Sequence, residues 1–196
     1  CRAVFLDDRD AEAYYEGFSN SAIWPLFHGF PQFTRFNEEE WEAYRRVNER
    51  FCEAVLAEAR PGDTLWIQDY HLMLLPSMLL EALPDASIGF FLHIPFPDYE
   101  TFRTLPWRDE IVRGVLGADL IGFHAFDYVR HFLSSCRAWR ASRTRAARSR
   151  LTDAWCRWTP SRSVSTTRAS ATPHAHRKCK QQWKRSRPRR DTKVAR

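Results

Sequence analysis

Residues 66–97 are WIQDYHLMLLPSMLLEALPDASIGFFLHIPFP, a stretch whose pattern predicts a strand, a helix and a second strand. An apolar run stops at Gln68 and Asp69, a helical pattern covers residues 72–83, and residues 88–92 form an apolar run too short for a helix. Unbroken apolar runs of this length are typical of strands buried on both faces, as in a parallel sheet. The stretch therefore predicts a parallel strand–helix–strand unit.

A polar residue stands at the exit of each predicted strand. Asp69 follows the first strand and His93 follows the second. Two parallel strands joined by a helix place these exits at the same carboxyl edge of the sheet, where open α/β sheets bind their ligands. The spacing therefore predicts a site that contains Asp69 and His93.

Neighbouring segments extend this pattern. Residues 107–116 predict a helix, residues 118–123 predict a strand with His124 at its exit, and residues 128–135 predict another helix. Upstream, residues 38–59 predict a long amphipathic helix. The apolar stripe of that helix consists of Trp41, Tyr44, Val47, Phe51 and Val55. Successive strand–helix units predict a doubly wound α/β fold, a parallel sheet with flanking helices.

Four motifs carry a resemblance to a known family. They are YYEGFSNSAIWPLFH, IQDYHLMLLP, FFLHIPFP and RTLPWRDEIVRGVLGADLIGFHAFDYVRHFLSS. Over residues 3–136 the chain resembles the trehalose-6-phosphate synthases of glycosyltransferase family 20. The resemblance implies a GT-B fold, with two Rossmann-like domains facing each other across a cleft, and residues 1–136 would form most of the first domain. It also implies transfer of glucose from UDP-glucose to glucose 6-phosphate, which gives UDP and α,α-trehalose 6-phosphate.

The resemblance also implies roles for individual residues. Tyr15 and Trp24 match positions that line the glucose 6-phosphate pocket, where aromatic faces pack on a sugar ring and a phenol can hydrogen-bond a phosphate. Asp69 matches the aspartate beside the acceptor sugar, and a carboxylate binds sugar hydroxyls through charge-assisted hydrogen bonds. His93 matches the histidine that contacts the transferred glucose. His71 lies close to the same sheet edge and is a further candidate for substrate binding.

The implied reaction retains the α configuration of the donor sugar. In the family the acceptor hydroxyl is thought to attack on the face that UDP leaves, and the departing phosphate takes the proton. Asp69 and His93 would then act by positioning substrates, with catalysis arising from orientation and from stabilisation of the leaving diphosphate. No cofactor and no metal are implied, and the sequence shows no metal-ligand spacing.

Each of these residues also has a purely structural interpretation. Asp69 at a strand exit could cap the next helix, and His93 could bond to backbone in a turn. Both aromatic residues could belong to the core. The motif context favours the binding roles for these four residues, whereas His28 and His124 have no claim beyond structure.

Composition changes abruptly near residue 136. Residues 1–136 hold 11 Lys and Arg against 22 Asp and Glu, whereas residues 137–196 hold 19 against 2. All 7 glycines and all 14 phenylalanines precede the change. A segment of the second kind cannot bury a core, so we expect residues 137–196 to be a disordered basic tail.

Two interpretations of this tail compete. A basic arm could bind nucleic acid or an acidic membrane, but the tail shows no nucleic-acid-binding signature, and we expect neither partner. Alternatively, the tail is translated out of frame. Codons can be chosen for residues 158–167 (WTPSRSVSTT) so that the same DNA, read from one nucleotide earlier, encodes VDAFPIGIDY. That segment resembles the one the family carries before its second domain. We therefore hypothesise a frameshift or mis-spliced gene near residues 134–139, and the coding DNA tests this.

The resemblance covers only part of the synthases. The family's Arg-x-Asp-x-x-Lys-Gly motif, which belongs to the donor site, is absent, and the chain opens at Cys1 within what resembles an interior segment. We therefore expect this chain to retain half of an acceptor pocket and to be inactive alone. The partners expected are glucose 6-phosphate and UDP-glucose, with a homo-oligomer possible for the full-length protein. A non-catalytic, synthase-like regulatory or sugar-phosphate-binding domain is the alternative.

Cysteine usage and the absence of targeting signals favour the cytoplasm. The five cysteines show neither zinc-site nor disulfide spacing, and Cys52 falls on the apolar side of a predicted helix, as a reduced core residue would. No signal peptide or membrane span is visible in the sequence.

Overall fold

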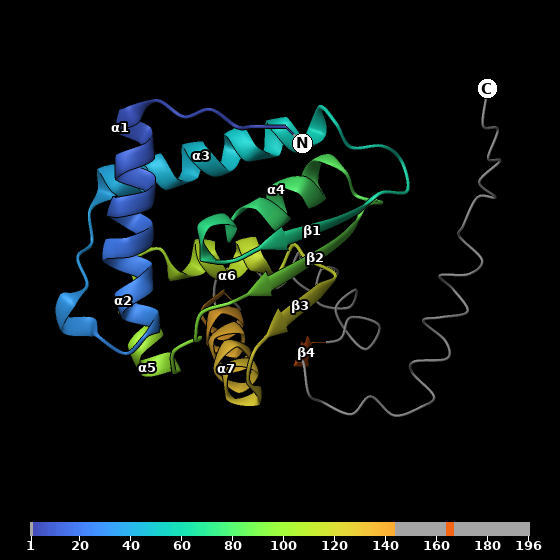
Figure 1. Cartoon of the computed structure of the whole chain (residues 1–196). Coiled ribbons are helices and arrows are strands. Elements are labelled where there is room, and N and C mark those ends of the chain that lie inside the picture. The colour runs from blue at the N-terminus through green and yellow to red at the C-terminus, as the bar shows by residue number, and fades with distance from the viewer. Residues whose placement is uncertain (1, 144–163, 167–196) are drawn as a thin grey trace, which may run out of the picture.

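In the computed structural model of this chain, the described residues are 2–143 and 164–166. The helical elements are α1 (Asp8–Ala11), the π-helix η1 (Glu12–Ile23), α2 (Trp24–Phe27), the 3-10 turn η2 (Pro31–Phe33), α3 (Glu38–Leu56), the 3-10 turn η3 (Tyr70–Leu72), α4 (Leu75–Ala82), α5 (Tyr99–Phe102), α6 (Arg108–Val115) and α7 (Phe126–Arg143). The strands are β1 (Thr64–Gln68), β2 (Ser87–Leu92), β3 (Leu120–Phe123) and β4 (Val164–Thr166). Figure 1 shows their arrangement.

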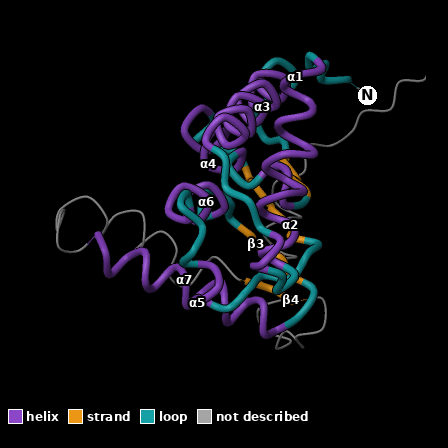
Figure 2. The backbone as a smooth tube through the Cα atoms, turned by 90° about the vertical axis from the view of Figure 1, so that its left-hand side faces the viewer, coloured by secondary structure: helices purple, strands orange, loops and turns teal. Residues whose placement is uncertain are grey.

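The strands form one parallel sheet in the order β1-β2-β3-β4. The crossover helices α4 and α6 lie on the same side of the strands (Figure 2). This is the outcome expected of strand–helix units that add strands in one direction with right-handed crossovers. The predicted parallel α/β fold is confirmed.

The two faces of the sheet carry different side chains. On the helix side, the central strands bury Ile88, Phe90 and Phe123, each no more than 1% exposed. On the other side, the ring of Trp66 covers Gly89 and the ring of Phe91 covers Gly122, so that a Cβ at either glycine would clash with a ring. The glycines match the register, in which Trp66 is opposite Gly89 and Phe91 is opposite Gly122. We call this side the aromatic face.

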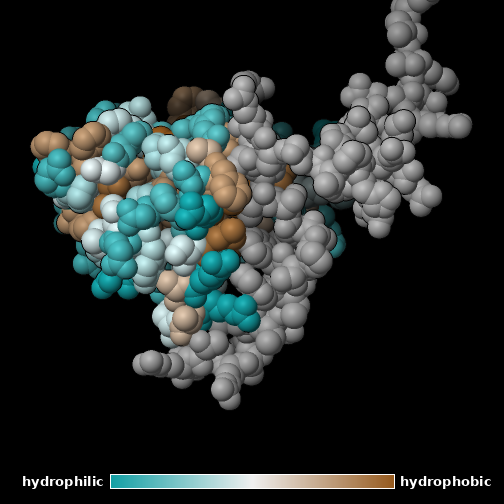
Figure 3. Space-filling model, turned by 90° about the horizontal axis from the view of Figure 1, so that it is seen from below, coloured by the Kyte–Doolittle hydropathy of each residue, from teal (hydrophilic) through white to brown (hydrophobic). Residues whose placement is uncertain are grey.

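The prediction that every strand is buried on both faces is wrong for β1. Trp66 is 53% exposed on the aromatic face, and Ile67 is the buried residue of this strand. The reason is the face that each side chain occupies, because Ile67 lies opposite Phe90 on the buried helix side whereas Trp66 lies on the aromatic face. Hydrophobic and hydrophilic side chains both reach the surface of the described part, and Figure 3 shows them side by side when the molecule is seen from below.

Several element boundaries differ from the predicted ones. The helix predicted over residues 72–83 begins at Leu75, since Tyr70–Leu72 forms a 3-10 turn and Pro76 occupies the first helical turn. α3 ends at Leu56, before the predicted residue 59. α7 continues to Arg143, so the change in composition at residue 136 falls inside a helix.

Most of the predicted basic tail lies outside the described residues. Within it, Val164–Thr166 pairs in parallel with β3 as strand β4. Among the described helices, none combines the length and apolar character needed to cross a membrane.

The helical rod α1–η1–α2 was not predicted by apolar periodicity. Its central part is a π-helix of 12 residues, with Tyr14, Phe18 and Ile23 among its buried residues. The buried set also includes Gly17, Ser19 and Ala22, small or polar residues that interrupt the apolar pattern. A search for α-helical periodicity therefore misses this element.

Candidate functional site

Asp69 joins the carboxyl ends of β1 and β2. Its Oδ1 accepts hydrogen bonds from the backbone N–H groups of Tyr70 (2.9 Å) and His93 (3.1 Å), and its own N–H donates to the carbonyl of Phe91 at 2.8 Å. The structure therefore brings Asp69 and His93 together at the sheet edge, as the strand pattern predicts. Both of these hydrogen bonds use Oδ1, so Oδ2 keeps its capacity to accept further hydrogen bonds.

Asp69 also has an unusual backbone conformation. Its φ of 70° and ψ of 174° lie in a region that is essentially reserved for glycine. Among the described residues, no other non-glycine residue has a positive φ. Strain of this kind persists where surrounding contacts impose it, and it concentrates at functional sites.

A buried hydrogen-bond network holds the loop of residues 69–73, which follows β1. The hydroxyl of Tyr44 donates to the carbonyl of Tyr70 (2.7 Å) and accepts from the N–H of Met73 (3.0 Å), while the amide of Asn48 donates to the carbonyl of His71 (3.2 Å). Tyr44 and Asn48 are both fully buried. Burial raises the pKa of Tyr44 well above its ordinary value, so the phenol stays protonated and available as a donor.

The ring of His71 stacks on one tyrosine and makes a tilted contact with another. It is nearly parallel to the ring of Tyr15, at a centroid distance of 5.4 Å and 8° between planes, and it contacts the ring of Tyr70 at 3.9 Å. Burial lowers the pKa of His71, and the nearby Asp69 carboxylate opposes this only in part. A neutral imidazole that packs flat on Tyr15 orients the Tyr15 ring, which is 49% exposed.

The π-helix places Tyr15 and Trp24 on one side of the rod. These residues are nine apart, which is about two turns of a π-helix at about 4.4 residues per turn, but about two and a half turns of an α-helix. The N–H of Trp24 donates to the carbonyl of Ser19, five residues earlier, as π-helical geometry requires. An α-helix would point the two rings to opposite sides. Trp24 is 42% exposed and stacks on His28 at 4.1 Å.

A second group, which we call the histidine cluster, consists of Gln68, His93 and His124. The Nε2 atom of His93 lies 2.7 Å from Oε1 of Gln68, and the His93 and His124 rings meet edge to face at 5.4 Å. Both histidine rings contact the ring of Phe91, so the cluster continues the aromatic face past the strand ends.

Sequence reasoning gave His124 and Gln68 no functional role. Yet both follow the rule that identified Asp69 and His93, since Gln68 ends β1 and His124 directly follows β3. The signal was therefore present at all three strand exits. The predicted residues divide into three contact groups: Asp69 with His93 at the sheet edge, Tyr15 with His71, and Trp24 with His28, which was given no functional role.

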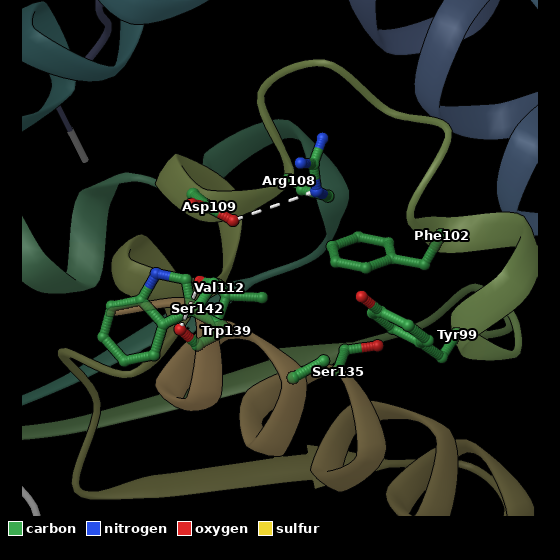
Figure 4. Close-up of a pocket in the computed structure, with 9 residues that line it drawn as sticks. Tyr99, Phe102, Arg108, Asp109, Val112, Ser135, Trp139 and Ser142 are labelled. Atoms are coloured by element: carbon green, nitrogen blue, oxygen red, sulfur yellow. Dashed lines mark hydrogen bonds and ion pairs between the residues drawn. The ribbon is translucent and has the colours of Figure 1, made fainter. Parts of the chain in front are cut away.

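A small hollow elsewhere in the molecule contains none of the predicted residues. It lies among α5, α6 and α7, and Tyr99, Arg108 and Trp139 are among its lining residues (Figure 4). It encloses about 60 Å³, whereas small-molecule sites usually measure about 300–1,000 Å³. In the part of the chain that the structure describes, no three His, Cys, Asp or Glu residues gather as a metal-ligand set.

The arrangement at the sheet edge is suited to a ligand rich in hydroxyl groups. The Asp69 carboxylate lies two residues from His71, which stacks on the exposed ring of Tyr15, and the His93 and His124 imidazoles stand at the neighbouring strand exits. Aromatic faces pack against the C–H groups of a sugar ring, while carboxylates and imidazoles bind its hydroxyls.

Comparisons with known proteins agree with this chemistry. The sequence model of Glycosyltransferase family 20 matches residues 1–165. An alpha,alpha-trehalose-phosphate synthase [UDP-forming] of Schizosaccharomyces pombe is 56% identical over 137 residues, which are 68% of this chain and 27% of the relative.

Two solved structures extend the comparison. The UDP-forming synthase of Burkholderia xenovorans, in complex with glucose-6-phosphate, is 35% identical with a TM-score of 0.63, over 65% of this chain and 28% of that one. The N-terminal domain of the trehalose-6-phosphate phosphatase of Candida albicans is 38% identical, also with a TM-score of 0.63, over 69% of this chain and 29% of that one.

These relatives are much longer than the matched region, since the chain spans somewhat under a third of the length of each. The family match, in contrast, covers most of the chain. On that match, together with the parallel sheet and the carboxylate at its edge, the chain belongs to glycosyltransferase family 20.

Proposed function

We propose that this chain forms the acceptor side of a UDP-forming α,α-trehalose-phosphate synthase, which transfers glucose from UDP-glucose to glucose 6-phosphate with retention of configuration. The observation that carries the proposal is the Asp69 carboxylate, which is fixed at two strand ends beside the Tyr15–His71 stack. The names of the relatives support the same activity, and one related structure holds glucose-6-phosphate.

Each site residue then has a defined task. Tyr15 and Trp24 pack against the acceptor sugar and bind its phosphate, and the free Oδ2 of Asp69 accepts hydrogen bonds from acceptor hydroxyls. His93 binds the transferred glucose, while His71 acts through Tyr15 by fixing the orientation of its ring. The acceptor hydroxyl attacks on the face that UDP leaves, and the leaving diphosphate takes its proton. Asp69 positions the acceptor and forms no covalent bond.

The remaining expectations about the protein stay proposals. UDP-glucose is the donor substrate, and we propose that no metal takes part. The protein works in the cytoplasm, which the free, buried thiols of Cys52 and Cys136 support, and it binds neither nucleic acid nor membranes. We also propose that the full-length protein forms a homo-oligomer, and that glucose transfer requires a donor site with an Arg-x-Asp-x-x-Lys-Gly motif.

We also propose the division into a synthase domain (1–136) and a basic tail (137–196) of out-of-frame origin. Sequencing the transcript across the codons for residues 131–158 tests the out-of-frame origin of the tail. An in-frame message that continues through VDAFPIGIDY to an Arg-x-Asp-x-x-Lys-Gly motif would support it, and a message that encodes the basic tail as written would refute it.

Calorimetric titration of the chain with glucose 6-phosphate tests the acceptor site. We expect binding that Asp69→Asn weakens at least about tenfold, since hydrogen bonds to charged groups contribute about 1.5–3 kcal/mol. Asn retains an Oδ1 acceptor for the two backbone donors, so the fold is kept. Asp85→Asn, at an exposed position, is the matched control. Equal affinity for glucose 6-phosphate and inorganic phosphate would contradict the proposal.

The second candidate is a non-catalytic, synthase-like domain that binds sugar phosphate for regulation. The similarity to the N-terminal domain of a trehalose-6-phosphate phosphatase favours it. Supplying the missing part of the Schizosaccharomyces pombe synthase in trans separates the candidates. Glucose transfer that depends on Asp69 identifies a synthase, whereas sugar-phosphate binding without transfer identifies the regulatory domain.

A further inference from the structure

The side-chain amide of Gln68 contacts the imidazole ring of His93. The Gln68 side chain reaches from the end of β1 to the imidazole at the end of β2, with 2.7 Å between Oε1 and Nε2. The same amide uses its NH₂ group to donate to the carbonyl of Ile67 at 3.3 Å. The amide orientation is therefore set by a backbone acceptor, and Oε1 is the atom that faces His93.

This orientation determines which ring nitrogen of His93 carries the proton. An amide oxygen can only accept a hydrogen bond, so Nε2 of His93 must be the donor. In the neutral imidazole, Nδ1 is then left as a lone-pair acceptor. Meanwhile the backbone N–H of His93 donates to Asp69, so Gln68 at the end of β1 holds the ring of His93 and the next residue, Asp69, holds its backbone.

We propose that Gln68 is a positioning residue, which fixes the Nε2–H tautomer of His93 and so makes Nδ1 an acceptor for a sugar hydroxyl. The identity of the ligand rests on the proposed function, but the tautomer does not. An acceptor at this position binds an O–H group of the transferred sugar and disfavours a phosphate oxygen, which also only accepts. Gln68 thus contributes to specificity without touching the substrate.

The tautomer can be measured on the full chain without any ligand. Histidine labelled with nitrogen-15 distinguishes Nε2–H from Nδ1–H by its chemical shifts, about two pH units above the ordinary imidazole pKa of about 6.5. We expect His93 to be almost entirely Nε2–H, with its signal assigned by its loss in His93→Gln.

Three variants complete the test. Gln68→Leu keeps the volume and removes the acceptor, so the ratio of Nε2–H to Nδ1–H should fall about fivefold to tenfold, the effect of one hydrogen bond. Gln68→Glu retains an oxygen and should restore the parent ratio. Gln32→Leu, at an exposed position in η2, is the matched control and should change nothing.

Two outcomes would overturn the proposal: a predominantly Nδ1–H tautomer in the parent chain, or an unchanged ratio in Gln68→Leu. Failure of glucose 6-phosphate to bind is a separate result. If glucose 6-phosphate does not bind but His93 is in the Nε2–H form, the proposed function is contradicted and the positioning role of Gln68 is retained.

Discussion

The 69–73 loop and the histidine cluster meet at the same sheet edge but are held in different ways. The loop is held by hydrogen bonds from the fully buried side chains of Tyr44 and Asn48 to its backbone carbonyls. The cluster lies on the exposed aromatic face, where Gln68 contacts His93, and the rings of His93 and His124 contact each other and Phe91.

This difference separates two kinds of contribution to the site. A polar group buried without a partner is costly, so the loop depends on the folded core for its shape. Exposed side chains contribute little to stability, so the cluster can be changed without unfolding the chain. Substitutions in the loop should therefore alter stability and binding together, whereas substitutions in the cluster should alter binding alone.

The largest expected effect is that of Tyr44→Phe. It removes one hydroxyl and leaves the carbonyl of Tyr70 and the N–H of Met73 buried without that partner. We expect the free energy of unfolding to fall by about 3 kcal/mol, since each buried unsatisfied group costs about 1–3 kcal/mol. Urea denaturation measures the change. Tyr99→Phe, the control, should stay within about 0.5 kcal/mol of the parent, and an equal effect in both variants would refute the role of the network.

The next effect concerns the strain at Asp69. Asp69→Gly and Asp69→Ala both lose the two side-chain hydrogen bonds, but only glycine adopts a φ of 70° without steric cost. We therefore expect Asp69→Gly to be more stable than Asp69→Ala by about 1–2 kcal/mol.

Asp85 provides the control for this comparison, because its backbone lies outside the positive-φ region. There the order should reverse, since glycine gains only conformational freedom in the unfolded chain. Asp69→Ala matching or exceeding Asp69→Gly in urea denaturation would show that the backbone at this position is unstrained.

The sequence predicts which residues lie at the carboxyl edge of the sheet better than it predicts which side chains hold those residues in place. Asp69 and His93 follow from strand exits, since parallel topology brings such exits together whatever the details of packing. Tyr44 was assigned to the apolar stripe of α3, and it does lie in the core. Its hydroxyl, however, bonds to a loop 26 residues away in sequence, a pairing that periodicity does not encode.

The π-helix shows a second limit. The motif that contains Tyr15 and Trp24 was identified by resemblance, but the residues are nine apart and would face opposite ways in an α-helix. Only the wider turn of η1 brings them to one side. η1 also packs against α3, a contact between separate segments that a helix pattern in the sequence does not encode.

A smaller effect should appear in the pH dependence of stability. Burial lowers the pKa of His71, so the unfolded chain takes up its proton at a higher pH than the folded chain does. Neutral His71 therefore makes its full contribution to the free energy of unfolding above pH 6.5, the ordinary pKa of the side chain. This contribution is lost as the pH falls from 6.5 through the lower pKa of His71 in the folded chain.

His71→Phe keeps a ring stacked on Tyr15 but cannot take up a proton. Below pH 6.5 its free energy of unfolding should fall less steeply than that of the parent chain, as followed by urea denaturation across a pH series. Gln32→Leu, which changes an exposed residue without a titratable group, should retain the parent slope. Parallel curves for the parent and His71→Phe would mean that His71 titrates alike in the folded and unfolded chains.

The smallest stability effect should belong to the histidine cluster. His124 is exposed, and its contacts are with the rings of Phe91 and His93. We expect His124→Ala to change the free energy of unfolding by less than about 0.5 kcal/mol. The nitrogen-15 signals of His93 should nevertheless shift, because the ring that meets it edge to face is gone. A loss of stability approaching that of Tyr44→Phe would mean that the cluster is part of the structural support of the sheet, and the contrast between the two regions would then fail.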